Sequence, residues 1–127
     1  MTTLMFFSFD GVDGAGKSTQ ITRFCDWLRA QGCDVITCRD PGSTPLGEQV
    51  RRILLASDES TPIGARSEML LYMAARTQLV EETIRPALCA GKSVVSDTVT
   101  VIIQIGNDSW SETVMMKVPP NHWAYHK

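Results

Sequence analysis

The sequence predicts an α/β fold, in which a parallel sheet carries helices on both faces. Short apolar runs of strand length occur at residues 4–9, 34–38 and 94–95, and stretches with helical spacing of apolar side chains separate them. A glycine-rich loop directly follows the first run and leads into the first helical stretch. Strands that alternate with helices favour a parallel sheet, whose ligands bind at the carboxyl ends of the strands.

The glycine-rich loop, residues 11–18, fits the phosphate-binding pattern G-x-x-x-x-G-K-S. Its glycines let the backbone turn tightly and bring N–H groups within reach of phosphate oxygens. Lys17 would place its charge on the β- and γ-phosphates of a nucleotide, and the Ser18 hydroxyl would bind Mg²⁺. A helix that begins here adds the positive end of its dipole. The alternative, a glycine-rich turn with a surface lysine, explains neither the strand before the loop nor the helix after it.

The next elements follow from cap and turn residues. The first helix is expected to end near Gly32, and a second strand follows it. Two prolines and a glycine make residues 39–45 a turn-rich loop. Thr44 is a good N-cap and Pro45 suits the first turn of a helix, so a helix over residues 46–56 is predicted.

A polar connection, residues 57–64, precedes a long helical stretch over residues 65–90. Pro86 is expected to kink this helix, because proline lacks an N–H and crowds the preceding turn. The third strand contains residues 94–95 and ends at Asp97.

Charged residues gather at the ends of the three predicted strands. Asp10 ends the first strand, Arg39 and Asp40 follow the second, and Asp97 follows the third. The carboxyl ends of parallel strands meet at one edge of the sheet, so these side chains are expected to share one active site.

Composition limits the class of protein. A chain of 127 residues is of single-domain size, and its net charge of −2 gives no sign of nucleic-acid binding. No apolar run is long enough for a membrane span, and the N-terminus lacks the features of a signal peptide. The four cysteines show no metal-binding spacing, so they are expected to be reduced thiols of a cytoplasmic protein.

Four segments together resemble the thymidylate kinase (dTMP kinase) family: residues 13–20, 39–48, 72–78 and 84–97. They stand in the family's order, and the resemblance covers about residues 4–97. It implies a P-loop nucleoside monophosphate kinase-like parallel sheet with helices on both faces, incomplete at the C-terminal side. It also implies ATP-dependent phosphorylation of dTMP to dTDP with Mg²⁺. The partners would be ATP and dTMP, and the resemblance allows a homodimer.

The resemblance assigns roles residue by residue. Asp13 would contact the sugar or phosphate of dTMP, and Arg51 would hold the acceptor phosphate. Tyr72 would lie against thymine and Arg76 would hydrogen-bond the base; their spacing puts both on one helix face. Asp97 would hold Mg²⁺ directly or through water. The implied catalytic residues are Lys17, Asp13 and Arg51, and the implied ATP-binding residues are Gly11, Val12, Asp13, Gly14, Ala15, Gly16, Lys17, Ser18 and Thr19.

Each of these side chains also has a purely structural interpretation. Tyr72 could be a core aromatic residue and Arg76 a solvated charge on a helix. Asp97 could be a turn former at the end of a strand. The neighbouring motifs favour the functional interpretation in each case.

The resemblance stops after Asp97. The family continues with an arginine and an aromatic residue, where this chain has Thr98 and Val99. Residues 98–127 form an unrecognised segment, with no helical or strand period in residues 109–127, so the sheet is expected to have three strands and an open edge. Some members carry an arginine in the P-loop after the acidic residue, where this chain has Gly14. A changed reading frame or a splice-like replacement would explain the abrupt end.

Three functions therefore remain open. The first is a thymidylate kinase with impaired activity, which we favour. The second is a non-catalytic, incomplete nucleotide-binding form of the same fold. The third is a P-loop ATPase that switches partners, although such a protein has no need of the pocket formed by Tyr72 and Arg76.

Overall fold

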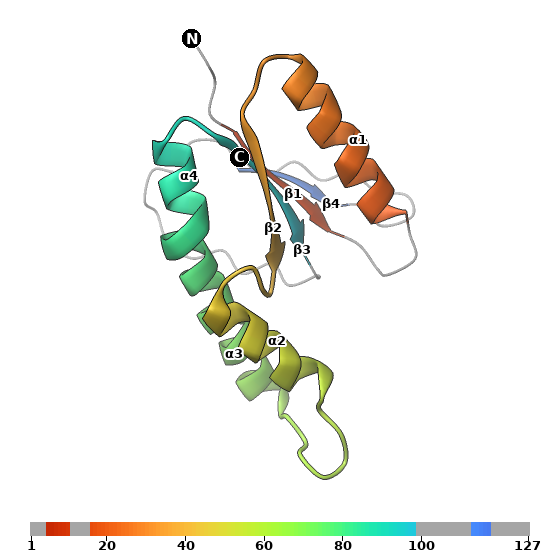
Figure 1. Cartoon of the computed structure of the whole chain (residues 1–127). Helices are drawn as coiled ribbons and strands as arrows, with labels where there is room; N and C mark the ends of the chain where they lie inside the picture. Colours follow the sequence, from red (N-terminus) through yellow and green to blue (C-terminus); the bar gives the residue numbers. More distant parts are fainter. Residues whose placement is uncertain (1–4, 11–15, 99–112, 118–127) are drawn as a thin grey trace.

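The computed structural model describes residues 5–10, 16–98 and 113–117, the last of these as backbone only. In this part of the chain a parallel sheet lies between two layers of helices. Helix α1 (Lys17–Ala30) covers one face, and α3 (Ala65–Leu79) and α4 (Arg85–Cys89) cover the other (Figure 1). This arrangement confirms the predicted α/β fold class.

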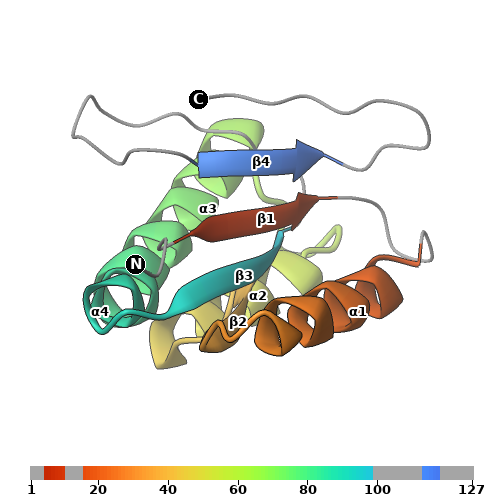
Figure 2. The same ribbon diagram turned by 90° about the horizontal axis from the view of Figure 1, so that it is seen from above.

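The sheet contains β1 (Phe6–Asp10), β2 (Val35–Asp40), β3 (Ser93–Thr98) and β4 (Thr113–Lys117). Their order across the sheet is β2-β3-β1-β4, and every neighbouring pair is parallel (Figure 2). Strand β2 is longer than predicted, because Arg39 and Asp40 pair with Asp97 and Thr98 of β3 instead of opening the loop. The turn-rich segment therefore begins at Pro41.

The expectation of three strands was wrong, because a fourth strand adds beside β1. Residues 113–117, where no strand period was recognised, form β4 and pair with β1 from Phe6 to Asp10. An uncovered parallel strand presents a row of backbone N–H and C=O groups, to which even a short run such as Thr-Val-Met-Met-Lys can add. Pairing of this kind joins distant segments, so local periodicity does not reveal it.

Side chains of the strands alternate between two apolar clusters. Toward α1, Phe7, Phe9 and Val95 pack with Cys25 and Leu28 of that helix. The other face holds a separate cluster, made by Cys38, Leu79, Ile84, Ala87 and Val94. Each face of the sheet is therefore fixed to its own helical layer.

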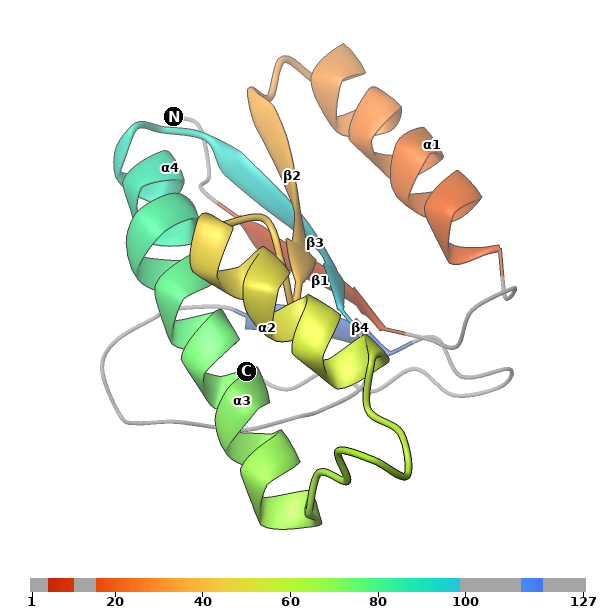
Figure 3. The same ribbon diagram turned by 60° about the horizontal axis from the view of Figure 1, so that its bottom comes forward.

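The helices agree with the sequence in most respects. Helix α2 (Pro45–Leu55) has Thr44 as its N-cap and Pro45 in its first turn, as predicted, and packs along α3 (Figure 3). The long helical stretch contains a π-helical turn, Val80–Ile84, between α3 and α4. This wider turn ends two residues before Pro86, which was predicted to distort the helix. In an ordinary α-helical turn, the proline ring would crowd the preceding turn. Among the described residues, no helix has the length and apolar character that crossing a bilayer requires.

The N-cap of α2 gives a test of this fold. The Thr44 side chain is almost fully buried, and its hydroxyl accepts a hydrogen bond from the Gly47 N–H at 2.9 Å. Thr44→Ala should lower the free energy of unfolding by about 1–2 kcal/mol, measured by urea denaturation, because the N–H loses its acceptor. Thr44→Ser keeps the hydroxyl and is the matched control. Equal stability of the alanine and serine variants would contradict this cap.

Candidate functional site

Lys17 and Asp97 form an ion pair at the carboxyl edge of the sheet. Lys17 Nζ lies 2.8 Å from Asp97 Oδ1, and the two side chains are 9% and 34% exposed. Lys17 is the first residue of α1, and Asp97 lies one residue before the end of β3. Because the lysine ammonium is largely withdrawn from water, the carboxylate compensates a charge that would otherwise be costly to bury. The structure thus brings together two of the residues that the sequence placed in one site.

The start of α1 has the local geometry of an anion-binding site. Gly16 is the N-cap and has φ +82°, a left-handed conformation that favours glycine although a Cβ would meet no neighbouring atom. Ser18 and Thr19 lie in the exposed first turn, at the positive end of the helix dipole. The other predicted loop residues, Gly11, Val12, Asp13, Gly14 and Ala15, lie outside the described residues.

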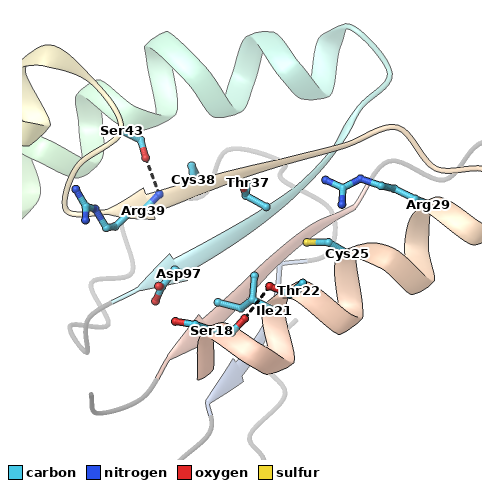
Figure 4. A pocket seen from close by; sticks show the side chains of 10 residues that line it. All are labelled: Ser18, Ile21, Thr22, Cys25, Arg29, Thr37, Cys38, Arg39, Ser43 and Asp97. Carbon is cyan, nitrogen blue, oxygen red and sulfur yellow. Dashed lines mark hydrogen bonds between the residues drawn. The ribbon is translucent and has the colours of Figure 1, made fainter. Parts of the chain in front are cut away.

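A cavity of about 410 Å³ opens between α1 and β2, beside the ion pair. Ser18 and Asp97 line one end of it, and Arg29 lies at the opposite end (Figure 4). Cys38 also lines the cavity, and burial raises the pKa of its thiol to about 11. At neutral pH this thiol therefore stays protonated and is not a nucleophile. The polar end of the cavity has the Ser18 hydroxyl and the Asp97 carboxylate, and Asp97 is also the ion-pair partner of Lys17. This set of groups suits a metal-bound phosphate.

A second group of predicted residues gathers around the end of β2. Arg76 of α3 places Nε 2.6 Å from Asp40 Oδ2. Arg51 of α2 donates from Nη1 to the carbonyl oxygen of Pro41 at 3.2 Å. Two arginines from two helices therefore contact the same dipeptide, Asp40–Pro41. Tyr72 lies one helical turn before Arg76 and is half-buried.

The loop that joins β2 to α2 is held by Glu48, a residue whose part the sequence did not reveal. Its carboxylate accepts from Ser43 N at 2.8 Å and from Arg39 Nη2 at 2.9 Å to each oxygen. These donors hold the pKa of Glu48 below its usual value, the Ser43 N–H first. A Cβ on Gly42 would come within 2.6 Å of Glu48 Oε1. The available signal in the sequence was a glycine, Gly42, followed six residues later by an acidic residue, Glu48.

Thr98, which stands where the family has arginine, is directed into the protein. Its side chain is buried, and its hydroxyl lies 2.8 Å from Ser8 Oγ and 3.2 Å from Ser96 Oγ. This threonine therefore completes a hydroxyl network between β1 and β3.

The predicted residues fall into two groups. Lys17, Ser18 and Asp97 lie near one another at the end of the cavity. Arg51 and Arg76 meet at the end of β2, on the α2–α3 side of the sheet, and neither is among the described residues that line the cavity. The carboxyl ends of β2 and β3 lie between the two groups.

Comparison with known proteins shows which family this chain resembles. The family model for thymidylate kinase matches residues 9–101. The thymidylate kinase of Chlorobium luteolum is 48% identical over 94 residues, which cover 73% of this chain and 42% of that protein. The thymidylate kinase of Solidesulfovibrio magneticus is 50% identical over 96 residues, covering 76% of this chain and 46% of that protein.

A solved structure gives the same result for the fold. The crystal structure of thymidylate kinase from Ehrlichia chaffeensis matches with a TM-score of 0.64 and 33% sequence identity. The match covers 73% of this chain and 53% of that one. The chain thus spans about half the length of the relatives that it matches. The resemblance seen in the sequence is confirmed, and the chain belongs to the thymidylate kinase family.

Proposed function

We propose that this chain binds ATP with Mg²⁺, binds dTMP, and transfers the γ-phosphate of ATP to dTMP at a reduced rate. The observation that carries this proposal is the Lys17–Asp97 ion pair at the start of α1. In this pair the Lys17 ammonium, which would bind phosphate, and the Asp97 carboxylate, which would bind a metal ion, contact each other. A bound nucleotide with its metal ion would separate them. The four free thiols suit the reducing environment of the cytoplasm, where we place the reaction.

The residues at the ion pair fit Mg²⁺. Asp97 and Ser18 line the same cavity and supply the oxygen ligands that this ion prefers. No group of three or more potential metal-binding side chains occurs among the described residues. This agrees with an ion held by one or two protein groups, phosphates and water. When bound, Mg²⁺ neutralises charge on the phosphates; Lys17 would turn from Asp97 toward the β- and γ-phosphates.

The acceptor would bind on the α2–α3 side. Arg51 would contact the dTMP phosphate, while Arg76 and Tyr72 would contact the base. Asp13 would contact the sugar or phosphate. No side-chain base is required, because a phosphate monoester, with a second pKa of about 6, is largely ionised at neutral pH. Phosphoryl transfer then depends on positioning and on neutralisation of charge.

A non-catalytic nucleotide-binding protein is the second candidate, and Thr98 favours it. The Thr98 hydroxyl is buried against Ser8 and Ser96, whereas an arginine at this position would offer a charged, bidentate contact to phosphate. ATP hydrolysis measured with and without dTMP separates the candidates. A kinase consumes ATP only with dTMP, a partner-switching ATPase consumes it without, and the non-catalytic form does neither.

The ATP site is tested with two variants at the ion pair. Lys17→Ala should weaken Mg²⁺–ATP binding by about 1.5–3 kcal/mol, because a charge-assisted contact to phosphate is lost. Asp97→Asn should weaken binding only when Mg²⁺ is present, since without the metal it merely removes a competing partner of Lys17. Calorimetric titration measures both effects. Lys92→Ala, at the opposite end of β3, is the control. Unchanged ATP affinity of the Lys17 variant would exclude this phosphate site.

The reaction itself is tested by a coupled assay with ATP and dTMP. Turnover of the unmutated 127-residue chain should lie below the usual enzyme range of about 1–10³ s⁻¹, because a charged contact to the acceptor phosphate is missing. Thr98→Arg should restore little, since it also breaks the hydrogen bond to Ser8. Turnover within the usual range would show that other groups of this chain replace the arginine.

A further inference from the structure

Asp40 is a buried carboxylate to which neither the fold nor the proposed chemistry gives an obvious role. It lies at the carboxyl end of β2 and is 5% exposed. Its ion pair with Arg76 has a short Nε–Oδ2 distance of 2.6 Å, and the arginine side chain is 22% exposed. The contact joins the sheet to α3, the helix that also carries Tyr72.

Stability alone explains this carboxylate poorly. Oδ1 is buried and has no hydrogen-bond partner among the described residues. Burial raises the pKa of Asp40, and the charge and hydrogen bond of Arg76 only oppose that effect. A buried ion pair with an unsatisfied oxygen is often no more stable than an apolar pair of the same size. Groups held in such an environment are concentrated at functional sites.

Pro41, the residue after Asp40, contacts Arg51, the second arginine of the candidate acceptor site. Pro41, which follows Asp40 through a cis peptide bond, accepts from Arg51 Nη1 through its carbonyl oxygen. One dipeptide at the edge of the sheet thus contacts an arginine from α2 and another from α3. The backbone of Asp40 is fixed in turn by its pairing with Thr98 of β3.

We propose that Asp40 is a positioning residue that sets base selectivity: it holds the Arg76 guanidinium where that group meets position 4 of the acceptor base, which is a keto oxygen in thymine. The inference rests on the proposed function. Arginine has only donors, so it favours thymine, whose O4 is an acceptor, over cytosine, whose N4 amino group is a donor. Without Asp40 the guanidinium loses this ion pair and its fixed direction, and the difference between the two bases shrinks.

The experiment measures dTMP, dCMP and Mg²⁺–ATP affinities of the 127-residue chain by calorimetry. Asp40→Asn removes the charge at nearly constant size. It should lower dTMP affinity about tenfold or more, the effect of one charge-assisted hydrogen bond, and bring the dTMP:dCMP ratio toward one. Mg²⁺–ATP affinity should change little. Asp26→Asn is the control, because it breaks an exposed Asp–Arg pair with Arg29 away from this site.

A double-mutant cycle with Arg76→Gln identifies the route of the effect. If Asp40 acts through Arg76, Asp40→Asn adds little in the Arg76→Gln background. Asp40→Glu retains the carboxylate and should keep the preference for dTMP, which gives a reading even if the asparagine variant does not fold. An unchanged ratio in Asp40→Asn, additive effects in the cycle, or loss of the preference in Asp40→Glu would overturn this inference alone. Absence of dTMP binding in the unmutated chain would overturn the proposed function and this inference with it.

Discussion

The parallel register of β1, β3 and β2 is the constraint on which the candidate site depends. It sets Asp97 beside Phe9 and Arg39, and Thr98 beside Asp10 and Asp40. Successive residues point to opposite faces, so Asp97 meets Lys17 of α1 while Asp40 meets Arg76 of α3. A slip of one residue would exchange the two faces and break both ion pairs. The two apolar clusters resist such a slip, because each belongs to one face.

This register also explains how the fold accommodates a threonine at position 98, where the family has an arginine. In a strand paired on both sides, residue 98 shares its face with Ser8 and Ser96, so a small hydroxyl side chain fits and is satisfied there. The threonine therefore suits the fold, although it offers nothing to an acceptor phosphate. Strand β4 pairs with β1, so that β1 is no longer an edge strand, and β4 contributes no residue that we assign to the site.

Local signals made much of the structure predictable. The glycine loop after an apolar strand marked the start of α1, and the Thr44–Pro45 pair marked the start of α2. The charged strand ends do lie at one edge of the sheet, but Asp97 faces Lys17 on the α1 side while Asp40 faces Arg76 on the α3 side. Non-local contacts were not predictable. Nothing near Asp40 in the sequence shows that it pairs with Arg76, and nothing in residues 109–127 shows that part of them joins β1.

The proposed function requires two separate nucleotide subsites, one on each side of the carboxyl edge of β3. Nuclear magnetic resonance of the ¹⁵N-labelled chain tests it most directly, with Mg²⁺–ATP and dTMP added in separate titrations. Mg²⁺–ATP should shift the backbone amides of residues 16–18 and Asp97, and dTMP should shift those of Asp40, Arg51 and Arg76. The same set of amides responding to both nucleotides, or no response to either, would contradict the account.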